Sequence, residues 1–174
     1  MSQPRSQKKR PAILAASVAA LLSLGILLAA PHAAADEYWD GTITEGSGLP
    51  NGKGGDGTWD ASSANWVDAS GNNPHTYDPT ELTVFSTIGG SVFVQGNLSF
   101  TALRFDVDHY VINSGASGKD EATLAPTGIA TITGQTAGTD SILNVNLVGS
   151  GGISIAGPGA ISLAGNTPIP AALR

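Results

Sequence analysis

Short runs of alternating apolar and polar residues, separated by glycine-rich turns, fill the chain from Glu81 to Asn166. Successive side chains of a β-strand point to opposite faces, so each run predicts a strand with one buried and one solvent-facing side. The expected buried positions are Val92 and Val94; Leu103, Phe105 and Val107; Leu143, Val145 and Leu147; Ile153 and Ile155; and Ile161 and Leu163. After the first 35 residues, no segment repeats apolar residues at helical spacing over three turns. We therefore expect an all-β fold with almost no helix in that part of the chain.

The predicted strands are only about 3–6 residues long, which is short for an independent sheet. Such strands suit a coil whose successive turns stack, because each strand then pairs with those above and below it and an apolar column is buried. With roughly 20 residues per coil, the region from Val92 to Asn166 would form about four turns. An antiparallel sandwich with glycine-rich hairpins shows the same alternation and is the structural alternative.

The first 35 residues have the composition of a secretory signal peptide, which we expect to be helical. Four basic residues, Arg5, Lys8, Lys9 and Arg10, precede an apolar stretch over 12–30, and the small residues 33–35 follow. This order predicts cleavage between Ala35 and Asp36 and export by the general route. An uncleaved membrane anchor is the alternative, because the apolar stretch is just long enough to cross a bilayer.

Removal of this leader makes the chain strongly acidic. It takes four of the eight Lys and Arg residues and none of the fourteen Asp and Glu residues, which leaves four against fourteen, a balance of −10. Such a surface repels nucleic acid and anionic lipid headgroups, so neither is an expected partner. The chain has no cysteine, so its stability must come from an apolar core and backbone hydrogen bonds.

All three tryptophans lie in a block rich in glycine, aspartate and asparagine, and they are the candidate ligand-binding residues. Trp39, Trp59 and Trp66, together with Tyr38 and Tyr77, could form an aromatic platform that stacks on sugar rings. The alternative is that the rings close one end of the stacked coils, where they cover the apolar column and shield strand edges. We favour this cap.

The ionisable residues form no pattern typical of a catalytic or metal site. Five aspartates crowd the first block, Asp36, Asp40, Asp56, Asp60 and Asp68, but none has the spacing of a calcium loop. Asp106 and Asp108 share one predicted strand face with Arg104, a natural ion partner, and nothing around them predicts a cleft. We expect His75 and His109 to be exposed polar residues. We therefore predict no catalytic residue, no metal site and no cofactor.

One segment near the C-terminus carries a repeat-like pattern. It reads Gly149-Ser-Gly-Gly-Ile-Ser-Ile-Ala-Gly-Pro-Gly-Ala-Ile-Ser-Leu-Ala-Gly-Asn-Thr167. It resembles the autotransporter-associated β-strand repeat, in which a Gly-Gly-Leu strand, a Gly-x-Gly turn and a Thr-Leu-Thr-Leu strand lead to Gly-x-Asn-Thr. The sequence departs from that pattern at Ile155, where the family usually has lysine, by one residue missing before Asn166, and at Pro168-Ile169-Pro170, which replace an aromatic residue and a glycine.

The N-terminal block supports the same resemblance. Tyr38-Trp39-Asp40-Gly41, Gly57-Thr58-Trp59-Asp60 and Asn65-Trp66 are similar to the opening of many exported repeat proteins of this kind. The resemblance implies a right-handed parallel β-helix displayed at the surface of a Gram-negative-type bacterium. Classical members also carry a C-terminal β-barrel, for which the residues after Asn166 are too few. We therefore expect a short secreted relative or a truncated piece of a longer protein.

Together these features predict four segments: a signal peptide (1–35), a tryptophan-rich N-terminal cap block (36–80), a β-strand repeat region (81–167) and a C-terminal tail (168–174). The expected function is that of an exported, non-catalytic surface or extracellular structural protein of the adhesion type, whose partner is an extracellular polysaccharide or a cell-surface molecule. The alternatives are a carbohydrate-binding module and, more weakly supported, a polysaccharide-active enzyme. We expect no membrane span other than the signal segment.

Overall fold

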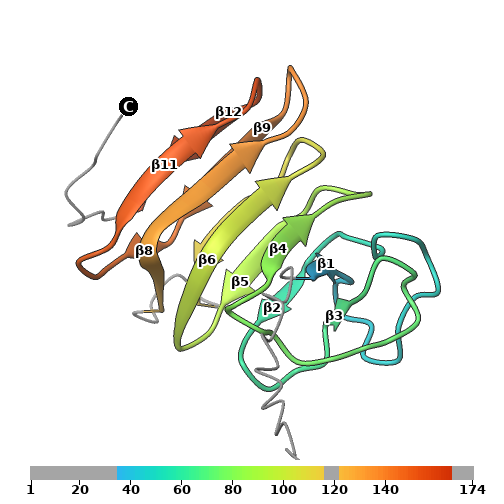
Figure 1. The fold of residues 1–174 in the computed structure, drawn as a ribbon. Coiled ribbons are helices and arrows are strands. Elements are labelled where there is room, and N and C mark those ends of the chain that lie inside the picture. Colours follow the sequence, from blue (N-terminus) through green and yellow to red (C-terminus); the bar gives the residue numbers. More distant parts are fainter. Residues whose placement is uncertain (1–34, 116–121, 166–174) are drawn as a thin grey trace, which may run out of the picture. The chain divides into compact units, whose positions relative to one another are not determined.

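The computed structural model describes residues 35–115 and 122–165, and these residues form twelve β-strands and no helix (Figure 1). The strands are β1 (Asp36–Trp39), β2 (Gly57–Trp59), β3 (Trp66–Val67), β4 (Leu82–Phe85), β5 (Ser91–Val94), β6 (Asn97–Phe105), β7 (Val111–Ser114), β8 (Thr123–Gly134), β9 (Asp140–Asn144), β10 (Asn146–Leu147), β11 (Gly152–Ala156) and β12 (Ala160–Leu163). The all-β prediction is confirmed for this part of the chain. Residues 1–34 of the expected signal peptide, the end of the repeat-like segment at Asn166-Thr167 and the predicted tail lie outside the described residues.

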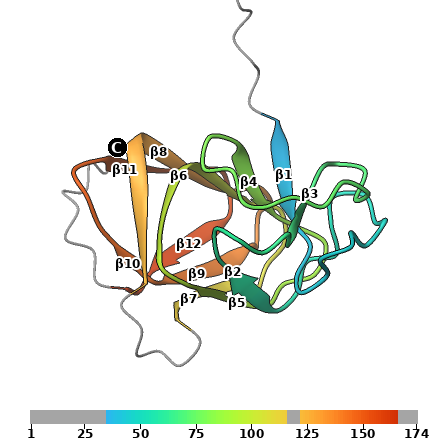
Figure 2. The same cartoon turned by 90° about the horizontal axis from the view of Figure 1, so that it is seen from below.

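The strands form two sheets. A seven-stranded sheet has the order β10-β8-β6-β4-β1-β3, with β11 also paired to β8, and a five-stranded sheet has the order β12-β9-β7-β5-β2. The strand pairs are parallel except for β1 and β3. Figure 2 shows the two sheets on opposite sides of a shared interior. The antiparallel sandwich is therefore wrong as the arrangement of these strands, since parallel neighbours need a crossover and not a hairpin.

The spacing between paired strands repeats. The offset is 20 residues in three parallel pairs: Leu82 with Ala102, Ser91 with Val111, and Asp140 with Ala160. Larger offsets join β6 to β8, where Asn97 pairs with Thr123, and β7 to β9, where Val111 pairs with Ile142. Both of these longer connections contain residues 116–121. The remaining parallel pairs have offsets of 23 residues for β8 with β10 and with β11, 35 for β2 with β5 and 46 for β1 with β4, so the predicted step of about 20 residues is found in three pairs.

Inward side chains from both sheets pack into one buried cluster. Val92, Ile112 and Leu143 of the five-stranded sheet share it with Leu103 and Ile132 of the seven-stranded sheet, and all five are fully buried. Asn144 and Asn146, which alternate with Leu143, Val145 and Leu147, are more exposed, as the alternation predicted. Trp39 and Trp59 belong to the same cluster, so the N-terminal block and the repeat region share one core.

The structure explains why one position of the repeat-like segment is glycine. Gly157 has a φ of +86°, and a Cβ built on it would lie 2.2 Å from the carbonyl oxygen of Gly134. Both the left-handed backbone and the close approach of two turns therefore require glycine at this position.

The prediction for the last two strands is partly wrong. Ile153 is buried and Ile161 packs against the core while remaining partly exposed, but Leu163 is 38% exposed and does not face a dry interior. Among the described strands β12 pairs only with β9, so no further described strand covers its outer edge. Apolar burial consequently falls at this end of the sheet.

Candidate functional site

The three tryptophans lie inside the protein. Trp39, Trp59 and Trp66 all have zero exposure, and their rings meet edge to face, with centroids 5.0 Å apart for Trp39 and Trp66 and 5.5 Å apart for Trp59 and Trp66. Tyr77 packs on Trp59 at 5.0 Å, and Phe85 contacts all three indoles. The sugar-stacking hypothesis thus has no exposed indole face on which to rest, because the three indoles pack against one another inside the core.

A buried carboxylate lies on the same face of β1 as Trp39. Glu37 precedes Trp39 by two residues, so the alternation of the strand turns both side chains inward, and Glu37 has zero exposure. Thr83, its partner across the strand pair, donates from Oγ1 to Glu37 Oε1 at 3.1 Å, and the Asp78 backbone N–H donates to Oε2 at 3.1 Å. Sequence analysis missed Glu37, although the inward direction of Trp39 would have indicated it.

His75 faces this carboxylate, which corrects the expectation that it is merely an exposed polar residue. Its Nε2 lies 3.7 Å from Glu37 Oε2, and its side chain is 35% exposed. The backbone of His75 forms an antiparallel bridge with Trp66, and its Nδ1 lies 3.0 Å from the carbonyl oxygen of Asn73. Because a carbonyl oxygen only accepts, Nδ1 carries the proton, and Nε2 is the nitrogen that faces Glu37.

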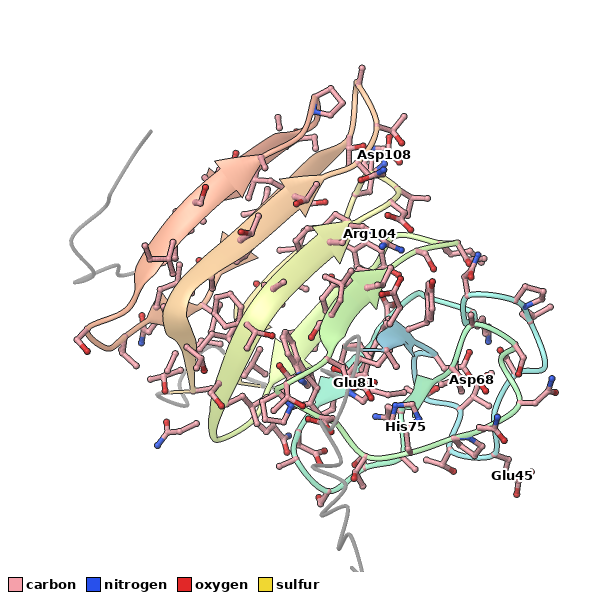
Figure 3. All side chains as sticks on the ribbon, viewed as in Figure 1. Glu45, Asp68, His75, Glu81, Arg104 and Asp108 are labelled. Atoms are coloured by element: carbon pink, nitrogen blue, oxygen red, sulfur yellow. The ribbon has the colours of Figure 1, made fainter. Side chains whose placement is uncertain are left out.

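Glu81 completes a cluster of three potential ligands. One ligand atom from each of Glu37, His75 and Glu81 lies within 4.8 Å of the other two. Figure 3 labels His75 and Glu81, which approach each other beside the N-terminal strands. The residues come from three places in the sequence that no short motif joins, so only the fold brings them together.

The electrostatics of the cluster favour added positive charge. Burial raises the pKa of Glu37 above its ordinary value of 4.5, against the opposing effects of His75, Asp78 and Thr83. The contact with the Glu37 carboxylate raises the pKa of His75, and this outweighs the burial of the imidazole; the charge of Glu81 adds to the same shift. Both residues therefore hold a proton more readily than they would in water.

The second group of charges is an ion-pair network on the outer face of the seven-stranded sheet. Arg104 Nε donates to Asp106 at 2.8 Å, which confirms the expected pairing, and its NH1 reaches Asp36 at 3.2 Å. Asp108 instead contacts the exposed His109 at 3.0 Å. Contrary to expectation, Asp106 and Asp108 do border a hollow of about 300 Å³, which residues 136–139 also line. The Asp106 carboxylate is already paired with Arg104, and Asp108 is paired with His109. The charged groups at this hollow therefore form ordinary surface ion pairs.

The aspartates of the N-terminal block organise turns. Asp40 is buried and accepts hydrogen bonds from the Ser47 N–H at 2.7 Å and the Lys53 N–H at 2.6 Å. Asp60 accepts bonds from Ser62 and Ser63 in the same manner. The bond from the Ser62 N–H to Asp60 closes an Asx turn, whereas Asp40 holds a longer loop through donors seven and thirteen residues away.

Comparison of the chain with models of known protein families, with curated protein sequences and with solved structures found no match to any of them. Within residues 35–115 and 122–165, the structure contains no helix that is long and apolar enough to cross a membrane.

Proposed function

We propose that this protein is an exported structural protein, built as a short right-handed parallel β-solenoid that acts as a surface or extracellular scaffold. The observation that carries the proposal is the parallel pairing of strands at a repeated offset of 20 residues around one apolar core. Such pairing is the expected result when successive coils stack, since each strand lies beside its equivalent in the next coil.

Side-chain ladders on the outer surface support stacking. Thr123 donates from Oγ1 to Asn97 Oδ1 at 2.8 Å, and these two residues are direct partners across β6 and β8. Asn144 donates to Asn113 Oδ1 at 3.1 Å, again between direct partners. Polar side chains that bond to the equivalent position of a neighbouring strand reinforce a solenoid along its length.

The features that favour a location outside the cytoplasm come from the sequence. The basic, apolar and small-residue order of residues 1–35 favours export, and the remaining chain is acidic and free of cysteine. The autotransporter-associated repeat that residues 149–167 resemble is found in exported passengers of β-helical form. An adhesion-type scaffold that presents hydroxyl, amide and carboxylate groups agrees with each of these features.

Expression of the full chain in a Gram-negative host tests the proposal. We expect a protein with the mass of residues 36–174 outside the cytoplasm, released from the cells by osmotic shock while a cytoplasmic marker protein is retained. A matched variant, Leu21→Arg combined with Leu22→Arg, interrupts the apolar stretch and should leave the whole chain inside the cell. Retention of the unaltered chain in the cytoplasm would overturn the proposal.

A further inference from the structure

We propose that Glu37, His75 and Glu81 bind a divalent transition-metal ion, with zinc as the best fit, and that the ion fastens β1 to the segment from His75 to Glu81. This site is independent of export and of any surface partner.

The orientation of His75 is that of a metal ligand. Its backbone is held by the bridge to Trp66, and its Nδ1–H donates to the Asn73 carbonyl oxygen at 3.0 Å. A histidine ligand is commonly fixed in this way by a backbone carbonyl on the nitrogen remote from the metal. The other nitrogen, Nε2, is buried and has no hydrogen-bond partner, although a carboxylate oxygen lies 3.7 Å away.

The carboxylates are placed to share an ion with this nitrogen. Glu37 is held rigidly by the donors of Thr83 and Asp78, which occupy Oε1 and one side of Oε2. Metal bonds of about 2.1 Å in a tetrahedron separate the ligand atoms by about 3.4 Å, close to the 3.7 Å found between His75 and Glu37. Glu81 is partly exposed, so its carboxylate can move the short distance that coordination requires.

The donor set selects the class of ion. One imidazole nitrogen and two carboxylate oxygens suit zinc and the neighbouring first-row ions, with water as the remaining ligand. Calcium and magnesium prefer oxygen ligands alone.

Calorimetric titration of the chelator-treated full chain with Zn²⁺ tests the site, using protein without a histidine tag. We expect one zinc ion per chain, and binding weakened by about tenfold or more in His75→Gln and in Glu81→Gln. His109→Gln is the matched control, because His109 also contacts a carboxylate but is 83% exposed, and it should bind zinc as the unaltered chain does. His32→Gln serves as a second control.

Imidazole ¹⁵N spectra identify the ligand atom directly, since the chain has only three histidines. Zinc should shift the Nε2 signal of one histidine, and His75→Gln should remove that signal. If His75→Gln fails to fold, as seen by circular dichroism, Glu81→Gln decides the test. No zinc binding, equal binding by Glu81→Gln, or tighter binding of Ca²⁺ than of Zn²⁺ would each overturn the proposal.

Discussion

The ring of Phe105 stacks on the ring of Phe85, with centroids 5.1 Å apart and an angle of 11° between the planes. The two residues are direct partners across β4 and β6, at the same 20-residue offset that recurs elsewhere in the sheets. The stack therefore joins one layer of the core to the next.

Truncation of this stack should strongly destabilise the protein. Phe105→Ala removes a fully buried ring, and we expect a loss of about 3–5 kcal/mol in the free energy of unfolding. Phe93 lies on the partly exposed face of β5, so Phe93→Ala is the control and should cost clearly less. Urea denaturation followed by circular dichroism measures both, and equal losses would contradict the layered core.

Engineered disulfides should report the strand register. Ser91 and Val111 are direct partners on the partly exposed faces of β5 and β7, and neighbouring strands are about 4.8 Å apart, within disulfide range. Ser91→Cys with Val111→Cys should oxidise readily. Ser91→Cys with Asn113→Cys places the Cα atoms about 8 Å apart, beyond that range. Faster cross-linking of the second pair in a thiol titration would indicate another register.

Tryptophan fluorescence should be insensitive to sugars. Trp39, Trp59 and Trp66 have zero exposure, so oligosaccharides have no indole face to contact. Emission spectra recorded while polysaccharide fragments are added should show neither quenching nor a shift, whereas urea should shift the emission as the rings enter water. A saturable change with sugar would revive the stacking platform.

The hydroxyl of Thr83 should contribute more to the stability of the folded protein than the volume of the side chain does. Thr83→Val keeps the shape but removes the donor to the buried Glu37, and we expect a cost of about 1–3 kcal/mol. Thr83→Ser keeps the hydroxyl and is the matched variant, expected to recover part of that loss. Both are compared by urea denaturation with a chelator present, so that metal binding does not contribute. A Thr83→Val protein as stable as the unaltered chain would show that Glu37 does not need this donor.

The contribution of Asp60 to the free energy of unfolding should decrease at low pH. Burial alone would raise its pKa, but the hydrogen bonds from Ser62 and Ser63 outweigh that effect and lower the pKa below 3.8. A lowered pKa contributes stability that is fully present above pH 3.8 and is lost as the pH falls through the lower folded value. The stability advantage over Asp60→Asn should therefore shrink on acidification. An advantage that grows towards low pH would contradict this sign.

The sequence by itself determined which side chains of a strand share a face. Val92, Leu103 and Leu143 are buried because a pleated strand alternates its side chains whatever its partner is. That local rule is the same in a parallel stack and an antiparallel sandwich, so the direction of pairing was open until the tertiary structure decided it.

The tertiary structure alone decided which distant residues meet. Glu37 lies 38 residues before His75 and 44 before Glu81, and only the pairing of β1 with β4 and the bridge from Trp66 to His75 place all three side chains together. Leu163 shows the converse, because its pattern predicts burial but burial also needs a covering neighbour. Alternation is a property of one strand, whereas a site or a closed core is a property of several.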